Sequence, residues 1–236
     1  MATGAEAIVS IARAAGPAFP FATVERTARV LREARQDLWP ISGKGGGKNA
    51  HHVGPRHLAN LIIALASPQP IGAVEAVRAI RPLPYATRAV VYRDPTQRNA
   101  ARTELTGSEQ DRRDPANKSF GEVLEAMVAE GGDAHRRAAW ATHRSGGMEL
   151  ALCVSPALAE VSWPTSDGVW TDHFLPAERE LPFAHATLPK PKLPGRQVSI
   201  LPHDVITAAG ELWEDTLRRR AGDPAPPPSS AEGDTG

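Results

Sequence analysis

Basic side chains recur at helical spacing near the start of the chain. Arg26, Arg29 and Arg32 follow one another every three residues, and the glycine-rich segment GKGGGK, with Lys44 and Lys48, comes soon after them. Arginine can pair two donors with a guanine or bind a phosphate, and a lysine among glycines can approach a phosphate closely. Together with a nearby arginine they are the predicted nucleic-acid contacts: Arg26, Arg29, Arg32, Lys44, Lys48 and Arg56.

The same arginines have a second interpretation. Glu25 and Glu33 each lie four residues from Arg29, and such ion pairs are typical of an ordinary solvated helix. The distribution of charge favours the nucleic-acid interpretation. Residues 1–104 hold 14 Lys and Arg against 7 Asp and Glu, and residues 105–236 hold 13 against 20, so the net charges are +7 and −7. A basic part suits a polyanion, although two parts of opposite charge can also simply attract each other.

The glycine-rich segment does not match a nucleotide-binding loop. A phosphate-binding loop needs a preceding buried strand and a Ser or Thr directly after its lysine, whereas Asn49 follows Lys48. His51, His52 and His57 have no cysteine or carboxylate within their segment to complete a metal site. We therefore predict no nucleotide cofactor and no metal, and we interpret these histidines as surface residues that add positive character near DNA.

The remaining reactive residue types predict no catalytic site. His173 beside Asp172, and His203 beside Asp204, are sequence neighbours, which are seldom catalytic partners. Cys153 has no basic neighbour to activate its thiol, so we expect it to be inert. The sequence therefore predicts a protein that is not an enzyme.

Hydrophobic periodicity predicts helices first and strands later. The basic helix is expected to begin at Thr23, as its cap, and to bury Val24, Ala28 and Leu31. The helix that starts at Pro55 is apolar nearly all round and is expected in the core. The predicted helices are 5–15, 23–37, 55–66, 71–80, 119–130 and 204–220, the last capped by Asp204 and turning Leu217 inward, and the predicted strands are 148–155, 157–163, 169–174 and 196–200.

These elements predict an α+β protein in two parts. Residues 1–105 are expected to form a basic helical domain that is like a winged helix-turn-helix, with the lysine–glycine segment as its wing and Trp39 as the anchor of that wing. Residues 119–220 are expected to form a small α+β domain with an antiparallel sheet that folds on its own. Residues 106–118 are polar and predict a linker, and residues 221–236 are rich in Pro, Ser and acid and predict a disordered tail.

The overall composition is that of a globular protein. The chain has 236 residues, of which 41% are hydrophobic and 23% charged. One cysteine excludes an internal disulfide framework and favours a reducing compartment. No stretch reaches the roughly 18 apolar residues of a membrane span, and the first residues lack the basic start of a signal peptide. We expect a cytoplasmic protein that has no membrane partner.

Two motifs carry a resemblance to a known group of proteins. Leu31-Arg32-Glu33-Ala34, and Pro55-Arg56 leading into LANLIIA, resemble uncharacterised proteins encoded by prophages and related mobile elements of GC-rich bacteria, with an N-terminal helix-turn-helix-like segment. The resemblance covers residues 20–66 and, faintly, residues 201–212. Arg35 stands where the group commonly has glycine, and Gly54 stands where it often has threonine. The resemblance implies a mobile-element setting and no particular substrate.

The sequence thus supports two hypotheses. The first is a non-enzymatic DNA-binding protein of a phage or mobile element, a regulator or a packaging accessory, that binds double-stranded DNA and associates with itself through its second domain. The alternative is a structural or assembly protein of a phage-like particle that binds other protein subunits. Retention on heparin that salt reverses would favour the first, and co-purification with protein partners would favour the second.

Overall fold

The computed structural model describes residues 3–34, 37–40, 52–92, 118–130, 148–164, 168–176 and 198–221. Within these ranges the helices are α1 (Gly4–Ala15), α2 (Phe21–Ala34), α3 (Pro55–Ala64), α4 (Ala73–Ile80), α7 (Phe120–Glu130) and α9 (His203–Ala221), with short 3-10 turns η1 (Gly16–Ala18) and η2 (Pro70–Gly72). The strands are β1 (Tyr85–Tyr92), β2 (Glu149–Cys153), β3 (Leu158–Pro164), β4 (Gly168–Phe174) and β5 (Ser199–Pro202). The predicted α+β class is confirmed, whereas the predicted linker 106–118, except Lys118, and the predicted tail after Ala221 lie outside the described residues.

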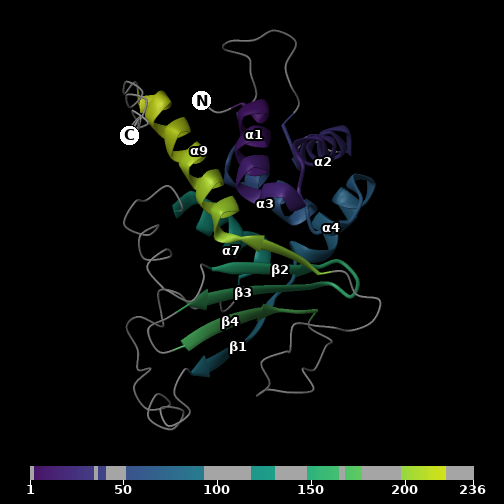
Figure 1. Ribbon diagram of the computed structural model, residues 1–236, viewed down its shortest axis with the longest axis vertical. Coiled ribbons are helices and arrows are strands. Elements are labelled where there is room, and N and C mark those ends of the chain that lie inside the picture. The colour runs from purple at the N-terminus through teal and green to yellow at the C-terminus, as the bar shows by residue number, and fades with distance from the viewer. Residues whose placement is uncertain are drawn as a thin grey trace, which may run out of the picture.

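The five strands form one antiparallel sheet in the order β1-β4-β3-β2-β5. The predicted hairpin of β2 and β3 is confirmed, with Leu150 opposite Val161. The sequence pattern predicts only helices in residues 1–105, and this prediction is wrong for β1, which pairs along its length with β4. The first part of the chain therefore contributes an edge strand to the sheet of the second part (Figure 1).

Local chemistry explains where the first two helices begin. The Thr3 hydroxyl accepts from the Glu6 amide at 3.3 Å while the Glu6 carboxylate accepts from the Thr3 amide at 2.7 Å, so a capping box starts α1. Gly16, with φ of +69°, ends this helix. The prediction that Thr23 caps α2 is wrong, because the Pro20 carbonyl already accepts from the Thr23 amide at 2.8 Å and the helix begins at Phe21.

The ends of two later helices also differ from the sequence-based expectation. Asp204 lies in the first turn of α9 rather than at its cap, because the helix begins at His203. Leu217 was expected to face inward and is 45% exposed, whereas its neighbour Thr216 is fully buried. The last turns of α9 lie beside α1 (Figure 1), and this packing covers the Thr216 side of α9 instead of the Leu217 side.

The core joins both predicted parts of the chain. Helix α3 is buried from Leu58 to Ala64, as its apolar sequence predicts, and it packs against α7. The Phe174 ring lies edge-to-face between Tyr85 at 5.8 Å and Phe120 at 5.2 Å. Buried residues of α1 to α4, α7, α9 and the helix-facing side of the sheet form one hydrophobic cluster. The division at residues 106–118 stays a prediction, but the side chains on its two sides pack together.

Candidate nucleic-acid interface

Helix α2 has one buried side and one exposed side. Its buried residues are Val24, Thr27, Ala28 and Leu31, which recur at three- and four-residue spacing. Arg26 and Arg29 lie on the exposed side, and Arg32 is half-buried. The sequence thus places the predicted basic side of the helix correctly. Every residue of α3 from Leu58 to Ala64 is buried, so α3 presents little surface to a large partner, whereas α2 exposes one side.

Arg29 of α2 is engaged on its own helix. Arg29 Nε donates to Glu33 Oε1 at 2.8 Å, and this hydrogen bond together with the charge of Glu33 raises the pKa of Arg29. The two side chains are 68% and 60% exposed. An ion pair as solvated as this contributes little to folding and can exchange its partner readily. The ion pair expected of an ordinary solvated helix is therefore present at Arg29, and a phosphate has to compete with Glu33 for that side chain.

Of the other predicted nucleic-acid contacts, the structure describes Arg56 but not the two lysines. Arg56 is exposed in the first turn of α3. Burial and then the positive charge of Arg56 lower the pKa of His57 and of Arg81, so Arg56 acts on a different neighbourhood from that of the α2 arginines. Lys44 and Lys48 lie outside the described residues. The structure thus brings Arg26, Arg29 and Arg32 onto one helix and sets Arg56 on another.

The chain on both sides of the lysine–glycine segment is held by the core. Before the segment, Leu38 and Trp39 are buried, and the Trp39 ring packs against Gly4, where an added Cβ would lie 3.4 Å from the indole nitrogen. The Leu38 carbonyl accepts from Asn60 Nδ2 at 3.1 Å. After the segment, Val53 is buried. The described residues on both sides of 41–51 are therefore held in a fixed framework.

His57 has a structural role that the sequence analysis missed. Its Nδ1 accepts from the Gly54 amide at 3.1 Å and so caps the start of α3. Burial and then the nearby charge of Arg56 lower the pKa of His57. A lowered pKa keeps the ring neutral near pH 7, so the interpretation of His57 as a source of positive charge is wrong. His52 is half-buried, and His51 lies outside the described residues.

The polar side chains on the sheet pair across strands. Arg88 holds Asp172 with two hydrogen bonds, Nε to Oδ1 at 2.6 Å and Nη2 to Oδ2 at 3.0 Å. His173, on the opposite face of β4, lies 3.2 Å from Glu160 through Nδ1. Asp172 and His173 therefore do not pair with each other, in agreement with the sequence analysis. Cys153 is buried at 2% exposure, which supports the expectation of an inert thiol.

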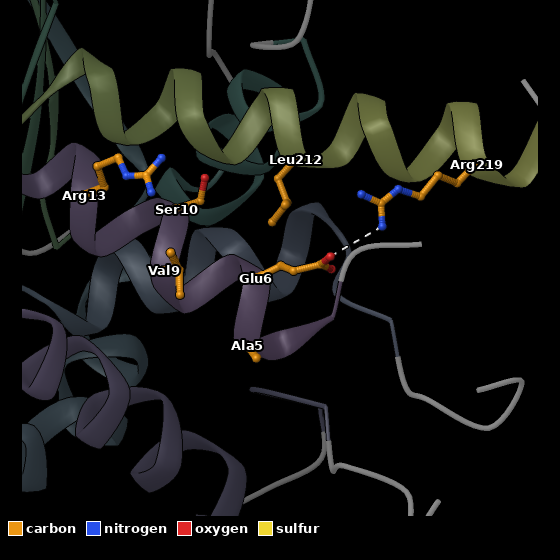
Figure 2. A pocket seen from close by; sticks show the side chains of 7 residues that line it. All are labelled: Ala5, Glu6, Val9, Ser10, Arg13, Leu212 and Arg219. Carbon is orange, nitrogen blue, oxygen red and sulfur yellow. Dashed lines mark hydrogen bonds and ion pairs between the residues drawn. The ribbon is translucent and has the colours of Figure 1, made fainter. Parts of the chain in front are cut away.

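A groove of about 440 Å³ runs between α1 and α9, and Figure 2 shows its lining. Val9 and Leu212 form its apolar part, while Arg219 at one end pairs with Glu6 at 3.4 Å and with Asp215 at 2.6 Å. Arg13 lies toward the other end (Figure 2). The ion pair between Arg219 and Glu6 links α9 to α1. The residues that line the groove show no arrangement of reactive groups.

The described residues contain no cluster of three or more His, Cys, Asp and Glu side chains that could hold a metal ion. None of the described helices is both long enough and apolar enough to cross a membrane. Comparison with known proteins identified no matching family model and no similar curated protein or solved structure.

Proposed function

We propose that this chain is a non-enzymatic DNA-binding protein that uses the exposed side of α2 together with the lysine–glycine segment. The observation that carries the proposal is the position of α2. Its buried side is fixed to the core, its exposed side carries Arg26 and Arg29, and the chain that leaves it passes through the anchored Trp39 into the basic segment. The resemblance to prophage proteins adds the setting, in which the protein is a regulator or a packaging accessory.

In this proposal the two elements have different tasks. Helix α2 enters the major groove, where Arg26 and Arg32 contact base edges or phosphates and Arg29 exchanges Glu33 for a phosphate. Lys44 and Lys48 neutralise phosphates of the backbone beside the groove, and Arg56 does so beyond the second end of the segment. Most of the affinity then comes from phosphate contacts, so it depends strongly on salt.

The test is a salt titration of the full chain on double-stranded DNA. Replacing Arg26, Arg29, Lys44 and Lys48 by Ala removes up to four phosphate contacts, so the slope of log K against log salt flattens by about 3 to 4 units. A matched control removes four exposed cations elsewhere, Arg13, Arg78, Lys118 and Arg218, and changes the net charge equally. The proposal fails if both variants change the slope alike, or if the parent chain does not bind DNA at low salt.

A variant at Glu33 tests the role of Arg29 in the same salt titration. The Glu33→Gln variant removes the carboxylate that holds Arg29, and it leaves the buried side of α2 unchanged. We expect DNA affinity to rise by roughly two- to fivefold, because the exposed ion pair that a phosphate has to displace is weak. Glu75→Gln, at an exposed position of α4, is the control for the change in net charge. Equal effects of the two variants would mean that Arg29 does not contact DNA.

A second candidate function is assembly with other protein subunits. Its supporting observation is the exposure of large apolar side chains, with Ile71 at 80% and Phe21 at 50%. Such side chains are common at protein interfaces and add nothing to phosphate binding. Replacing both by Ser should abolish co-purification of partner subunits if the protein is an assembly protein. Retained partners together with salt-sensitive DNA binding would favour the first function.

A further inference from the structure

The groove between α1 and α9 has an apolar floor and a cation toward each end. Val9, which is 44% exposed, and Leu212 form the floor (Figure 2). Arg219 is 43% exposed at one end, and Arg13 is exposed toward the other. Among the residues that line the groove, Ser10 is the one neutral polar side chain. The groove therefore suits an occupant that carries negative charge and has an apolar middle with few hydrogen-bond donors, because unpaired donors on an apolar floor are costly.

The two cations differ in how far they are neutralised. Arg219 pairs with Glu6 at 3.4 Å and with Asp215 at 2.6 Å. Arg13 has no anionic partner among the residues that the structure describes. An added carboxylate does not have to displace another carboxylate at Arg13, so the Arg13 end is where the occupant's negative charge gains most.

Residues 222–236 follow α9 directly, and their chemistry matches the groove. Their sequence, GDPAPPPSSAEGDTG, contains three carboxylates, on Asp223, Glu232 and Asp234, and no Lys or Arg. Prolines occupy four of the five positions 224–228. Proline has no amide hydrogen, so a proline run can lie on an apolar floor without leaving donors unpaired. Such a run also favours the extended polyproline conformation, which loses little conformational entropy on binding.

The starting point and the length of this segment also fit. Helix α9 ends at Ala221, two residues beyond Arg219, so the segment starts near one end of the groove. The groove follows α1 from Ala5 to Arg13, about 12 Å at a helical rise of about 1.5 Å per residue. Residues 224–228 span about 15 Å at about 3.1 Å per residue in the polyproline conformation. Gly222 can adopt the positive φ of a chain reversal, so the segment is able to turn back along the groove.

We propose that residues 222–236 fold back into the groove between α1 and α9, with residues 224–228 over Val9 and Leu212 and the Glu232 carboxylate at Arg13. The composition of this segment predicts disorder in isolation, and the groove supplies the apolar surface that the segment itself lacks. Because segment and groove belong to one chain, their effective concentration is high and weak contacts are sufficient. This inference does not rest on DNA binding.

Disulfide trapping in the full chain tests the position of the segment. Ala225→Cys is combined with Val9→Cys in the test variant and with Leu217→Cys in the control. Leu217 is 45% exposed, does not line the groove, and is much closer to Ala225 in the sequence than Val9 is. A segment without a preferred position closes the shorter loop faster, whereas we expect the Val9 pair to form at least about threefold faster in oxidised glutathione. Cys153 does not compete, because it is 2% exposed.

A charge exchange in the test variant examines the contact at Arg13. We expect Arg13→Glu to slow trapping at Val9, and Glu232→Arg in the same chain to restore it by re-forming the ion pair in the opposite sense. Arg78→Glu, at an exposed position of α4, is the matched control and leaves the rate unchanged. Trapping at Val9 that is no faster than at Leu217, or that Arg13→Glu does not slow, overturns the proposal. Disulfides that join two chains also overturn it and identify a second copy as the occupant.

A measurement with one engineered cysteine serves if the paired variants fail to fold, which thermal unfolding detects. In Val9→Cys the thiol is labelled with a maleimide, and the rate is compared with that of the same chain in which Pro226, Pro227 and Pro228 are replaced by Gly. Faster labelling after the glycine substitutions supports the proposal, because the flexible segment no longer covers the thiol. Equal labelling rates overturn it.

Discussion

At the scale of single residues, two polar side chains near α3 hold the framework around the lysine–glycine segment. Asn60 is fully buried among the apolar residues of α3 from Leu58 to Ala64, and it both donates to the Leu38 carbonyl and accepts from Arg81 Nη1 at 2.7 Å. Arg81 also pairs with Glu125 of α7. One polar residue in the apolar run LANLIIA was visible in the sequence, but its partners lie 21 and 22 positions away, so the sequence did not reveal them.

Replacing Asn60 by Ala should therefore destabilise the protein strongly. The Leu38 carbonyl loses its donor and Arg81 loses an acceptor in a largely dry environment, so we expect the free energy of unfolding to fall by about 2–4 kcal/mol. Denaturant unfolding measures the change. Gln69→Ala, which removes an exposed amide, is the control and should change stability by less than about 0.5 kcal/mol. A small effect at Asn60 would mean that the anchoring of Leu38 depends on other contacts.

His57 predicts a dependence of stability on pH. Its pKa in the folded protein is lowered from the ordinary value of 6.5, first by burial and then by Arg56. The unfolded chain therefore binds the proton more readily, so stability is complete above about pH 6.5 and declines as the pH falls below it. Protonation of Nδ1 also removes the acceptor for the Gly54 amide. We expect thermal unfolding between pH 7 and pH 5 to show this decline.

The control for His57 is a residue that caps without titrating. In His57→Gln the side-chain oxygen can accept from Gly54, as Gln does at this position of a capping box, and it carries no charge at any pH. The variant should show a flatter profile between pH 7 and pH 5. The pKa values of Glu6 and Glu122 are also lowered, but from an ordinary value of 4.5. These two groups therefore change the stability at lower pH and do not contribute to a decline between pH 7 and pH 5. An equally steep profile in the variant would contradict the assignment to His57.

At the scale of elements, strong periodicity was enough to predict most of the structure. The apolar stripes of α1, α2, α3 and α7 and the hairpin of β2 and β3 depend on residues close together in the sequence. Strand β1 was missed because YATRAVVY shows no clear alternation of polar and apolar residues, and its partners on β4 are distant in sequence, from Phe174 opposite Tyr85 to Gly168 opposite Tyr92. Strand pairing at that distance leaves no local signal.

The candidate interface was predictable in part for the same reason. The three arginines of α2 and the apolar stripe opposite them follow from helical spacing. Arg29 donates a hydrogen bond to Glu33, although Glu25 is equally spaced from it. This pairing depends on side-chain geometry, which the sequence does not contain. The anchoring of Trp39 against Gly4 depends on the packing of α1, although the sequence did indicate Trp39 as an anchor. The cap at His57 carried no recognised signal, because histidine is an unusual residue for that role.

At the scale of the whole molecule, the shared core changes one expectation about fragments. The sequence pattern predicts that residues 119–220 fold alone. In the structure, the Leu83 and Arg81 carbonyls accept from the Phe120 and Gly121 amides at 2.8 and 2.9 Å, and α3 covers α7. A fragment 119–220 would lose β1, the cover of α7 and these partners, so we now expect it to lack a cooperative unfolding transition.

Circular dichroism during thermal unfolding of this fragment tests the expectation. The full chain, measured in parallel, should unfold cooperatively. A sharp transition in the fragment would show that the second part is an independent domain and would restore the division at residues 106–118. The absence of such a transition, together with recovery of folding when residues 1–105 are added in trans, would demonstrate a single cooperative unit.

The packing of α1 against α9 has a consequence for the time course of folding. Glu6 and Arg219 meet although 213 positions separate them in the sequence. Contacts of this separation give the native state a high contact order, and high contact order slows folding because a long chain must close before the contact stabilises it. During synthesis α1 leaves the ribosome well before α9. The part of its apolar side that α9 covers is exposed until α9 has been made, which makes α1 a natural site for chaperone binding on the nascent chain.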